Sequence, residues 1–312
     1  MSKGEKVLVT GGAGFIGSNL VDALLAEGNT VVVVDNLSTG KVENVNPQAK
    51  LIQADISDVE KLQNIFREEK PQSVFHLAAQ IDINKSTRDP IWDAEQNILG
   101  SINLLENCRD FSVKKIIFSS SAGVYGDSEN VPTLEDDLLR PPSPYGIGKL
   151  SVEHYLEYYF KTYNLSYVTL RYANVYGPRQ ISNGEGAVVA IFCDLLAKGQ
   201  RPRIDGDGEQ TRDYVYVADI VNANILAWRS DKVGIYNIGT GIETSVNKLA
   251  QIIKETLASD IDFEKGPARK VDQRRSALGA SRAKADLNWQ AQVTLEEGIK
   301  KTIEWIKQKN DS

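Results

Sequence analysis

The stretch Thr10-Gly11-Gly12-Ala13-Gly14-Phe15-Ile16-Gly17 decides the fold that the sequence predicts. It follows an apolar run at residues 7–9 and precedes residues 18–25, whose apolar spacing is that of a helix. Glycines at 11, 14 and 17 allow a tight turn whose backbone N–H groups reach a pyrophosphate at the helix N-terminus. A second apolar run ends in Asp35, about 20 residues further on, where a ribose-binding acid is expected. The pattern predicts a dinucleotide-binding unit, and an ordinary glycine-rich loop is the alternative.

Composition limits the classes of protein to which the chain can belong. Its 312 residues are 41% hydrophobic and 25% charged, enough for one large core or two ordinary ones. A net charge of −6 without long basic tracts argues against a nucleic-acid partner. Because we find neither an N-terminal signal nor an apolar run of membrane-spanning length, we expect a soluble, cytoplasmic protein without a membrane partner.

The cysteines and histidines predict no metal site. Cys108 and Cys193 lie far apart without metal-binding or redox spacing, so both are expected to be buried, reduced thiols. His76 falls in an apolar strand pattern and His154 in a helical one, and neither has a partner at ligand spacing.

Strands alternate with helices through the first half of the chain. The expected strands cover residues 6–10, 30–35, 50–53, 73–78, 114–119 and 166–171. The expected helices cover residues 15–27, 58–69, 93–109 and 145–163. This alternation is typical of an α/β fold with a doubly wound, mostly parallel Rossmann-type sheet. We expect that domain at 1–174 and a smaller substrate domain at 175–312, interleaved because segments 212–219 and 233–238 look as if they return to the sheet.

Candidate catalytic residues lie in the stretch Ser143-Pro144-Tyr145-Gly146-Ile147-Gly148-Lys149. A serine cap followed by proline starts a helix, which places Tyr145 and Lys149 one turn apart on the same face. A fixed positive charge beside the phenol is expected to lower the pKa of Tyr145, so that it serves as a base near neutral pH. This spacing is unspecific, since about one such match is expected by chance. Residues 118–126 add weight, because a strand there ends in hydroxyls, including Ser121, at the sheet edge where α/β folds bind ligands.

With these motifs the whole chain resembles the extended short-chain dehydrogenase/reductases, and within them the UDP-glucose 4-epimerases. The resemblance rests on the glycine turn, the serine run, the Tyr/Lys pair and further motifs at residues 35–40, 55–56, 76–80, 97, 171–174 and 208–213. It implies NAD as cofactor and a UDP-sugar as substrate. It also implies a mechanism in which Tyr145 takes the proton of the sugar 4-hydroxyl while C4 gives a hydride to the nicotinamide. The 4-keto sugar then turns over before hydride and proton return.

The resemblance also implies the residues that contact each ligand. The implied catalytic set is Ser121, Tyr145 and Lys149. The implied NAD contacts are Gly11, Gly14, Phe15, Ile16, Gly17, Asp35, Asn36, Ser38, Thr39, Gly40, Asp55, Ile56, Leu77, Ala78, Ala79, Gln80, Asn97, Ser119, Tyr145, Lys149 and Tyr172. The implied UDP-sugar contacts are Ser121, Ala122, Tyr145, Asn174, Val188, Arg203, Arg212, Arg269, Asp272 and Ser276.

Departures from the family pattern bear on the reaction. Related dehydratases and decarboxylases carry an acidic pair or a glutamate where this chain has Ala122 and Gly123, so a proton donor worth roughly 100-fold is missing. Lys270-Val271 replaces a Pro-Gly pair, and Gly279 replaces an acid. A net oxidoreductase or another nucleotide-sugar enzyme remains an alternative, as does a non-enzymatic NAD-sensing module.

Two further expectations concern specificity and assembly. The resemblance implies that Ser276 borders the sugar C2 substituent, where a serine leaves room for an N-acetyl group. UDP-N-acetylglucosamine and UDP-N-acetylgalactosamine are therefore expected substrates beside UDP-glucose and UDP-galactose. The opposing interpretation is that the altered loop has moved Ser276. Helices 93–109 and 145–163 carry wide apolar stripes, which pair across a homodimer in the resembling family, and core packing is the alternative. The crowded side chains are Tyr155, Leu156, Tyr158, Tyr159 and Phe160.

Overall fold

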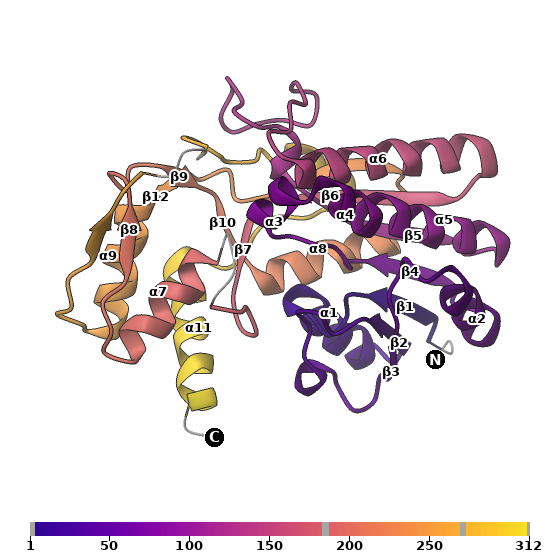
Figure 1. Cartoon of the computed structure of the whole chain (residues 1–312), viewed down its shortest axis with the longest axis horizontal. Helices are drawn as coiled ribbons and strands as arrows, with labels where there is room; N and C mark the ends of the chain where they lie inside the picture. Colours follow the sequence, from indigo (N-terminus) through magenta and orange to yellow (C-terminus); the bar gives the residue numbers. More distant parts are fainter. Residues whose placement is uncertain (1–3, 183–186, 269–272, 311–312) are drawn as a thin grey trace.

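The computed structural model describes residues 4–182, 187–268 and 273–310. Within these ranges seven parallel strands form one large sheet (Figure 1). They are β1 (Lys6–Thr10), β2 (Thr30–Asp35), β3 (Lys50–Gln53), β4 (Ser73–His76), β5 (Lys115–Ser121), β6 (Ser166–Tyr172) and β11 (Gly234–Ile238). Their order is β3-β2-β1-β4-β5-β6-β11, the doubly wound order of a dinucleotide-binding fold. The expected fold class is confirmed.

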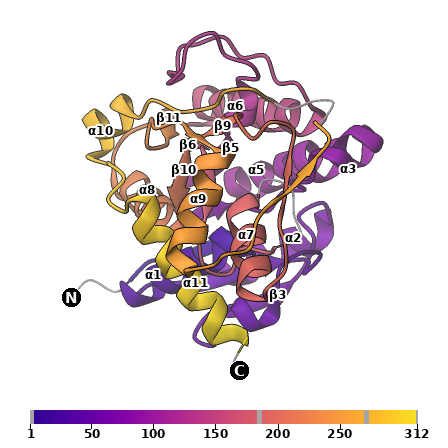
Figure 2. The ribbon, with the colours of Figure 1, turned by 90° about the vertical axis from the view of Figure 1, so that its left-hand side faces the viewer.

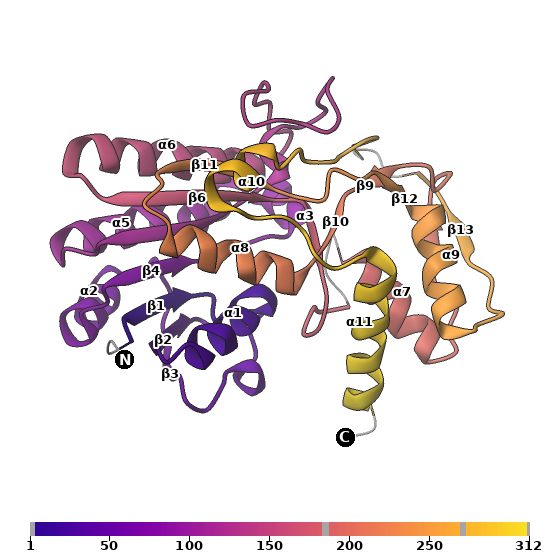
Figure 3. The ribbon, with the colours of Figure 1, turned by 180° about the vertical axis from the view of Figure 1, so that it is seen from behind.

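Helices cover both faces of the large sheet, because its strands are apolar on both sides. One face, seen in Figure 3, is covered by α1 (Phe15–Ala26) and α8 (Val217–Arg229). The other is covered by α2 (Val59–Glu69), α5 (Gly100–Asp110) and α6 (Pro144–Tyr163). Leu20 and Ile220 belong to the first core, and Leu62 and Leu156 to the second. Shorter helices follow the strand ends: η1 (Val42–Asn44), α3 (Ile83–Arg88) and η3 (Ala122–Val124). The short helix α10 (Ser281–Leu287) packs on β11 and α8, on the face seen in Figure 3.

The expected helix over residues 93–109 is present and contains one π-helical turn. The chain forms α4 (Pro90–Ala94), a π-helical segment η2 (Glu95–Leu99) and then α5. Asn97, in the π-helical turn, is buried, and its Nδ2 donates to the Gln80 carbonyl at 2.9 Å. Ser101 Oγ donates to the Asn97 carbonyl at 2.6 Å. The predicted helix is confirmed, and its π-helical turn, which the sequence analysis did not predict, brings Asn97 to the loop after β4.

A smaller lobe lies beside the large sheet (Figures 1 and 2). Its elements are β7 (Asn174–Tyr176), α7 (Val188–Ala197), β8 (Arg203–Asp205), β9 (Thr211–Arg212), β10 (Tyr214–Tyr216), β12 (Thr244–Ser245), α9 (Val246–Leu257), β13 (Glu264–Gly266) and α11 (Leu295–Asn310). Its strands form three two-stranded sheets, β10-β7, β12-β9 and β13-β8. The helices α7, α9 and α11 pack together around a separate apolar core that includes Phe192, Leu249 and Ile303.

The chain returns to the large sheet after it has entered the smaller lobe. Residues 234–238 form β11, which pairs with β6 in parallel, so the expectation for segment 233–238 is confirmed. The expectation for segment 212–219 was wrong at residues 212–216. There β10 pairs with β7 outside the large sheet, and only α8, which begins at Val217, packs onto it.

Both cysteines lie in the hydrophobic cores of the protein. Cys108 and Cys193 are both buried free thiols, as expected. Burial raises the pKa of both thiols, that of Cys193 to about 12. None of the helices in the described ranges combines the length and the apolar character needed to cross a membrane.

Candidate active site

The glycine turn joins β1 to α1 at the carboxyl edge of the large sheet. Gly11 has φ +71°, and a Cβ there would lie 2.7 Å from the Ala78 nitrogen, so only glycine fits this close approach. Gly14 occupies the N-cap position of α1 and has no side chain that could accept a hydrogen bond from the first N–H groups of the helix. A Cβ on Gly14 would meet little besides the Gly11 oxygen at 3.2 Å. The turn therefore leaves the first N–H groups of α1, at Phe15 and Ile16, facing an open space that suits a phosphate.

Asp35 closes the other side of this cradle. The carboxylate is buried, and its Oδ2 accepts from the Ala13 nitrogen at 2.9 Å and its Oδ1 from the Leu37 nitrogen at 2.8 Å. A Cβ on Gly40 would lie 2.9 Å from both oxygens, so the loop after β2 packs directly on the acid. Each oxygen retains a second lone pair, which is what two ribose hydroxyls require.

The expected adenosine contacts lie on two neighbouring loops of the same edge. Asn36 Nδ2 donates to Asp55 Oδ2 at 2.7 Å, and its Oδ1 accepts from the Ser38 nitrogen at 3.0 Å. The Ile56 carbonyl accepts from Asn103 Nδ2 at 2.7 Å, which holds this loop against α5. The structure thus places the predicted residues of the loops after β2 and β3 side by side.

The loop after β4, with the predicted residues Leu77, Ala78, Ala79 and Gln80, is held from beneath by residues that the sequence analysis missed. The Ala78 nitrogen donates to Thr10 Oγ1 at 3.2 Å, and Gln80 Nε2 donates to Asp93 Oδ1 at 2.8 Å. Asp93 is buried, which raises the pKa of its carboxyl group. Nothing in the spacing of Gln80 and Asp93 points to this contact.

The predicted catalytic hydroxyls meet where β5 ends and α6 begins. Ser121 is the last residue of β5, and Tyr145 lies in the first turn of α6. The expected helix start is confirmed, since Ser143 Oγ accepts from the Gly146 nitrogen at 3.2 Å and proline follows it. The Ser121 hydroxyl is the neighbouring group that acts to lower the pKa of the Tyr145 phenol. A Cβ on Gly123 would lie 3.4 Å from Ser121 Oγ, so this glycine keeps the space beside the pair open.

Lys149 lies one turn along α6 and points at the strand end. Its Nζ donates to the Ser119 carbonyl at 2.7 Å and lies 4.9 Å from the centre of the Phe118 ring. Burial lowers the pKa of Lys149 to about 8, against the opposing effect of the Glu153 and Asp93 carboxylates.

The expected direction of the Tyr145 pKa shift was wrong. Burial raises the pKa of Tyr145, and the charge of Asp93 adds to this, whereas the Ser121 hydroxyl acts in the opposite direction. The Lys149 ammonium is 5.9 Å from the centre of the Tyr145 ring and is engaged with the Ser119 carbonyl. Desolvation of the phenol therefore outweighs its cationic neighbour.

A buried ion pair beneath the serine run was also missed. Arg171 and Glu153 are both 2% exposed, with Nη2 2.6 Å from Oε2. Glu153 Oε1 accepts from Ser120 Oγ, and Arg171 Nη1 donates to the Tyr125 hydroxyl at 2.7 Å. The pair thereby supports the residues on both sides of Ser121. In the sequence, the one indication that Glu153 lies near the site is its position one helical turn beyond Lys149.

Two predicted sugar-nucleotide residues are brought together by the smaller lobe. Asn174 starts β7, and its backbone N–H donates to the Asp213 carbonyl at 2.9 Å, next to Arg212 on β9. Arg212 Nη1 donates to the Gln273 carbonyl at 2.7 Å. The buried Asp213 carboxylate accepts from the Leu278 nitrogen at 3.2 Å, so it joins this strand to the segment that carries Ser276.

The remaining predicted residues lie at different places. Val188 begins α7, and Arg203 begins β8 with its Nε 2.8 Å from Asp205 Oδ1. The Tyr172 hydroxyl is buried and pairs with the Asn224 amide, beneath the serine run. Arg269 and Asp272 lie outside the described residues. Among the residues described, no cluster of three or more acidic, histidine or cysteine side chains could hold a metal ion.

A glycine turn, an acid at the end of the second strand and a Ser-Tyr-Lys set at one edge of a doubly wound sheet define a nucleotide-dependent dehydrogenase/reductase fold. A sequence profile for the family described as GDP-mannose 4,6-dehydratase matches residues 8–302. The chain therefore belongs to the extended short-chain dehydrogenase/reductase family, as its motifs predicted.

Solved structures of epimerases are similar to this chain over nearly its whole length. UDP-glucose 4-epimerase from Thermotoga maritima, solved with UDP-glucose, is 48% identical with a TM-score of 0.96, covering 98% of this chain and 99% of its own. UDP-glucose 4-epimerase from Thermus thermophilus, solved with NAD, is 42% identical with a TM-score of 0.93, covering 97% and 99%. UDP-N-acetylglucosamine 4-epimerase from Methanobrevibacter ruminantium, solved with UDP-N-acetylmuramic acid, is 39% identical with a TM-score of 0.93, covering 98% and 99%.

Proposed function

We propose that this chain is an isomerase, an NAD-dependent 4-epimerase of UDP-hexoses. The observation that carries the proposal is that Ser121, Tyr145 and Lys149 lie together where β5 ends and α6 begins, with Ala122 and Gly123 next to them. This site has a proton acceptor for a sugar hydroxyl and lacks the neighbouring carboxylate that elimination or decarboxylation requires. The similarity to epimerases solved with UDP-glucose and with NAD supports the same assignment.

The residues of the glycine turn fit NAD. The open space outside Gly14, the first N–H groups of α1 and the two-sided Asp35 carboxylate match a pyrophosphate and an adenosine ribose. Asp55 and Ile56 would border the adenine, and the loop carrying Ala78 would border the nicotinamide half. When bound, NAD would accept a hydride from the sugar C4 and return it, and its positive ring would favour ionised Tyr145.

In this mechanism the chain supplies one proton acceptor and the means to hold the sugar in two orientations. Tyr145 removes the proton of the 4-hydroxyl, and Ser121 donates a hydrogen bond to the same sugar oxygen. Lys149, held by the Ser119 carbonyl, keeps a positive charge beside the strand end. The 4-keto sugar turns over, and Tyr145 returns the proton on the other face.

Strong binding of the UDP half would allow the hexose to turn without leaving. Arg212 and Asn174 lie together and would hold the UDP, with Val188, Arg203, Arg269 and Asp272 as further proposed contacts. Ser276 would border the sugar C2 substituent, and its small size would admit acetamido sugars. The similarity to a UDP-N-acetylglucosamine 4-epimerase supports this wider substrate range.

Incubation of the purified protein with UDP-galactose and no added cofactor tests the proposal. We expect UDP-glucose to form to equilibrium without net formation of NADH, because the hydride is returned in each turnover. Stoichiometric NADH with an oxidised sugar nucleotide would show a net oxidoreductase. A 4-keto-6-deoxy product would show a dehydratase, and absence of any turnover would favour a sensing module.

We further propose a homodimer formed by α4, η2 and α6. Tyr155 and Tyr158 are 38% and 50% exposed, whereas Leu156 and Tyr159 are buried in the core, so core packing explains only part of the apolar stripe. Leu99, in the η2 segment that packs against α6, is 58% exposed. Light scattering at micromolar concentration should give twice the chain mass of 34.4 kDa, and Leu99→Glu should produce monomers. A monomeric wild-type protein would refute the dimer.

A further inference from the structure

The mechanism proposed above makes no use of one buried carboxylate beside the site, that of Asp93 in α4. Asn97, one helical turn further along in η2, is buried as well. Ile91 and Leu99 belong to the same segment and are exposed. Asp93 and Asn97 therefore form the inward face of α4 and η2, which pack against α6.

Asp93 Oδ1 holds the loop that follows β4. It accepts from Gln80 Nε2 at 2.8 Å and from Asn97 Nδ2 at 3.2 Å. The backbone of Gln80 is fixed too, because its N–H donates to Asn97 Oδ1 at 2.8 Å and its carbonyl accepts from Asn97 Nδ2 at 2.9 Å. Gln80 Nε2 also donates to the Asp82 carbonyl at 2.9 Å. Since a carboxylate can only accept hydrogen bonds, Asp93 determines which way both amides face.

Asp93 Oδ2 lies toward α6. Gly148 comes between Tyr145 and Lys149 in that helix, and a Cβ on Gly148 would lie 3.7 Å from Asp93 Oδ2. Burial lowers the pKa of Lys149, and the charges of Glu153 and Asp93 oppose this effect. Burial raises the pKa of Tyr145, and the charge of Asp93 adds to this. One carboxylate thus acts on both neighbouring groups of the proposed catalytic set.

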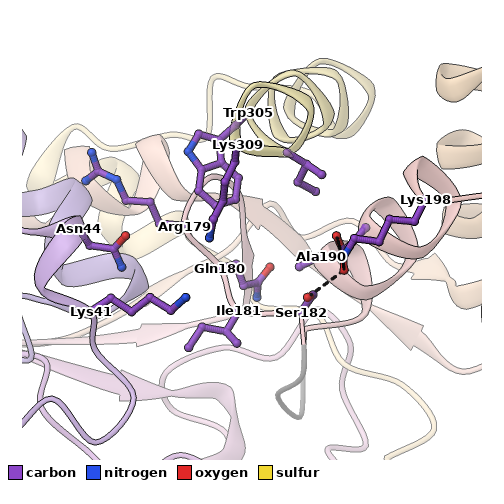
Figure 4. A pocket seen from close by; sticks show the side chains of 12 residues that line it. Lys41, Asn44, Arg179, Gln180, Ile181, Ser182, Ala190, Lys198, Trp305 and Lys309 are labelled. Atoms are coloured by element: carbon purple, nitrogen blue, oxygen red, sulfur yellow. Dashed lines mark hydrogen bonds and ion pairs between the residues drawn. The ribbon is translucent and has the colours of Figure 1, made fainter. Parts of the chain in front are cut away.

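The charged group that acts on Asp93 is Lys149 of α6, with Glu153 one turn further along the helix. His76 in β4 is neutral, because burial, with a contribution from Lys149, lowers its pKa to about 3. The lysines of the cavity in Figure 4 are remote, since none of the described residues that line it belongs to α4, η2 or α6. Asp82 caps α3, where its Oδ1 accepts from a backbone nitrogen at 2.9 Å. The other ionisable side chains of residues 83–99 are exposed and screened by solvent: Lys85, Arg88, Asp89 and Glu95.

We propose that Asp93 is a positioning residue for the reaction proposed above: its carboxylate orients Gln80 and Asn97 beside the cofactor site, and its charge balances that of Lys149. The inference rests on the proposed function, because it assigns Asp93 a role in the same site. Loss of this charge should lower the pKa of both Tyr145 and Lys149, so the pH range of activity should move to lower pH as a whole. A residue that only supported the fold would lower activity equally at every pH.

Titration of Tyr145 in the protein with its bound cofactor tests this coupling. The tyrosinate absorption would be followed against pH as the difference between each protein and its own Tyr145→Phe form, which cancels the signal of the other tyrosines. Asp93→Asn keeps an oxygen that accepts from Gln80 and Asn97 and removes the charge. The matched control is Asp89→Asn, at the exposed N-cap of α4.

We expect the midpoint of Tyr145 ionisation to fall by at least about 0.5 pH unit in Asp93→Asn and by less than about 0.2 unit in Asp89→Asn. The acid limb of turnover should move with the midpoint. Asp93→Leu also removes the acceptor, so its turnover should fall at least about tenfold below that of Asp93→Asn.

A lower midpoint in Asp93→Asn alone supports the inference. An unchanged midpoint in Asp93→Asn, or an equal fall in Asp89→Asn, would overturn it. Because the titration requires no turnover, the two proposals fail separately. If the midpoint falls as expected and the wild-type protein does not epimerise UDP-galactose, only the proposed function is refuted; if the protein epimerises and the midpoint is unchanged, only the role of Asp93 is refuted.

Discussion

The imidazole of His76 should make the protein lose stability as the pH falls. The ring is 1% exposed in β4, with Nδ1 2.8 Å from Thr10 Oγ1 and Nε2 2.9 Å from Ser101 Oγ. Ser101 uses its proton on the Asn97 carbonyl, so its oxygen accepts from Nε2–H, and Nδ1 then accepts from Thr10. Thr10 Oγ1 in turn accepts from the Ala78 nitrogen. The neutral ring thus completes a chain of bonds beneath the proposed NAD site, and a second ring proton would break it.

The magnitude follows from the proton affinities of the two states. Burial, with a contribution from the charge of Lys149, lowers the pKa of His76 from its ordinary 6.5 to about 3. Between these values the unfolded chain binds a proton that the native protein does not, so the free energy of unfolding falls as the pH falls from about 6.5 to about 3. Each tenfold difference in proton affinity is worth about 1.4 kcal/mol, so the loss between pH 7.5 and pH 5 is about 2 kcal/mol.

The chain has two histidines, which provides a matched control. Urea unfolding at pH 7.5 and pH 5, followed by tryptophan fluorescence at equal cofactor content, would be compared for wild type, His76→Asn and His154→Asn. His154 is exposed on α6, so its variant should keep the wild-type pH dependence. His76→Asn should lose about 2 kcal/mol less than wild type between the two pH values. Equal losses in wild type and His76→Asn would refute the reasoning, whatever the absolute stability of the variant.

Three further predictions concern the proposed reaction. Tyr145→Phe removes the phenol and keeps the ring, so turnover should fall at least about 100-fold with unchanged NAD content, and undiminished turnover would exclude Tyr145 as the base. Ser276→Tyr should abolish turnover of UDP-N-acetylglucosamine and retain that of UDP-galactose, whereas equal losses would show that Ser276 does not border the sugar. Protein denatured after purification should release NAD(H) in mass analysis, because Asp35 would repel a 2′-phosphate, and mainly NADP(H) would contradict this assignment.

Local sequence patterns predicted the parts of the fold that depend on neighbouring residues. The strands β1, β2 and β3 have the expected bounds, and β1 and β2 are apolar runs followed by turns. The start of α6 was predictable from Ser143 and proline for the same reason. The π-helical turn at η2 was not, because it depends on hydrogen bonds from Asn97 to Gln80, 17 residues away in the chain.

The polar groups that support the site were harder to predict, because their partners are distant in the sequence. Asp213 accepts from the Leu278 nitrogen, 65 residues away, and Arg171 meets Glu153 across 18 residues. The pKa of Tyr145 also escaped prediction, since spacing shows that Lys149 is near but does not show how deeply the phenol is buried. Burial is a property of the whole fold, and here it determines the direction of the shift.

Family membership and reaction type depend on different residues of this chain. A dehydratase, an epimerase and a dehydrogenase of this fold would all require the glycine turn, Asp35 and the Tyr145/Lys149 pair. A match to a family described as a dehydratase therefore does not specify the reaction. The difference lies at Ala122 and Gly123, where neither side chain can transfer a proton. A carboxylate there would protonate or deprotonate a carbon or leaving group beside C4. Without such a carboxylate, the site has one base, Tyr145, for one sugar hydroxyl. The reaction that these groups can carry out is oxidation at C4 followed by reduction of the same carbon.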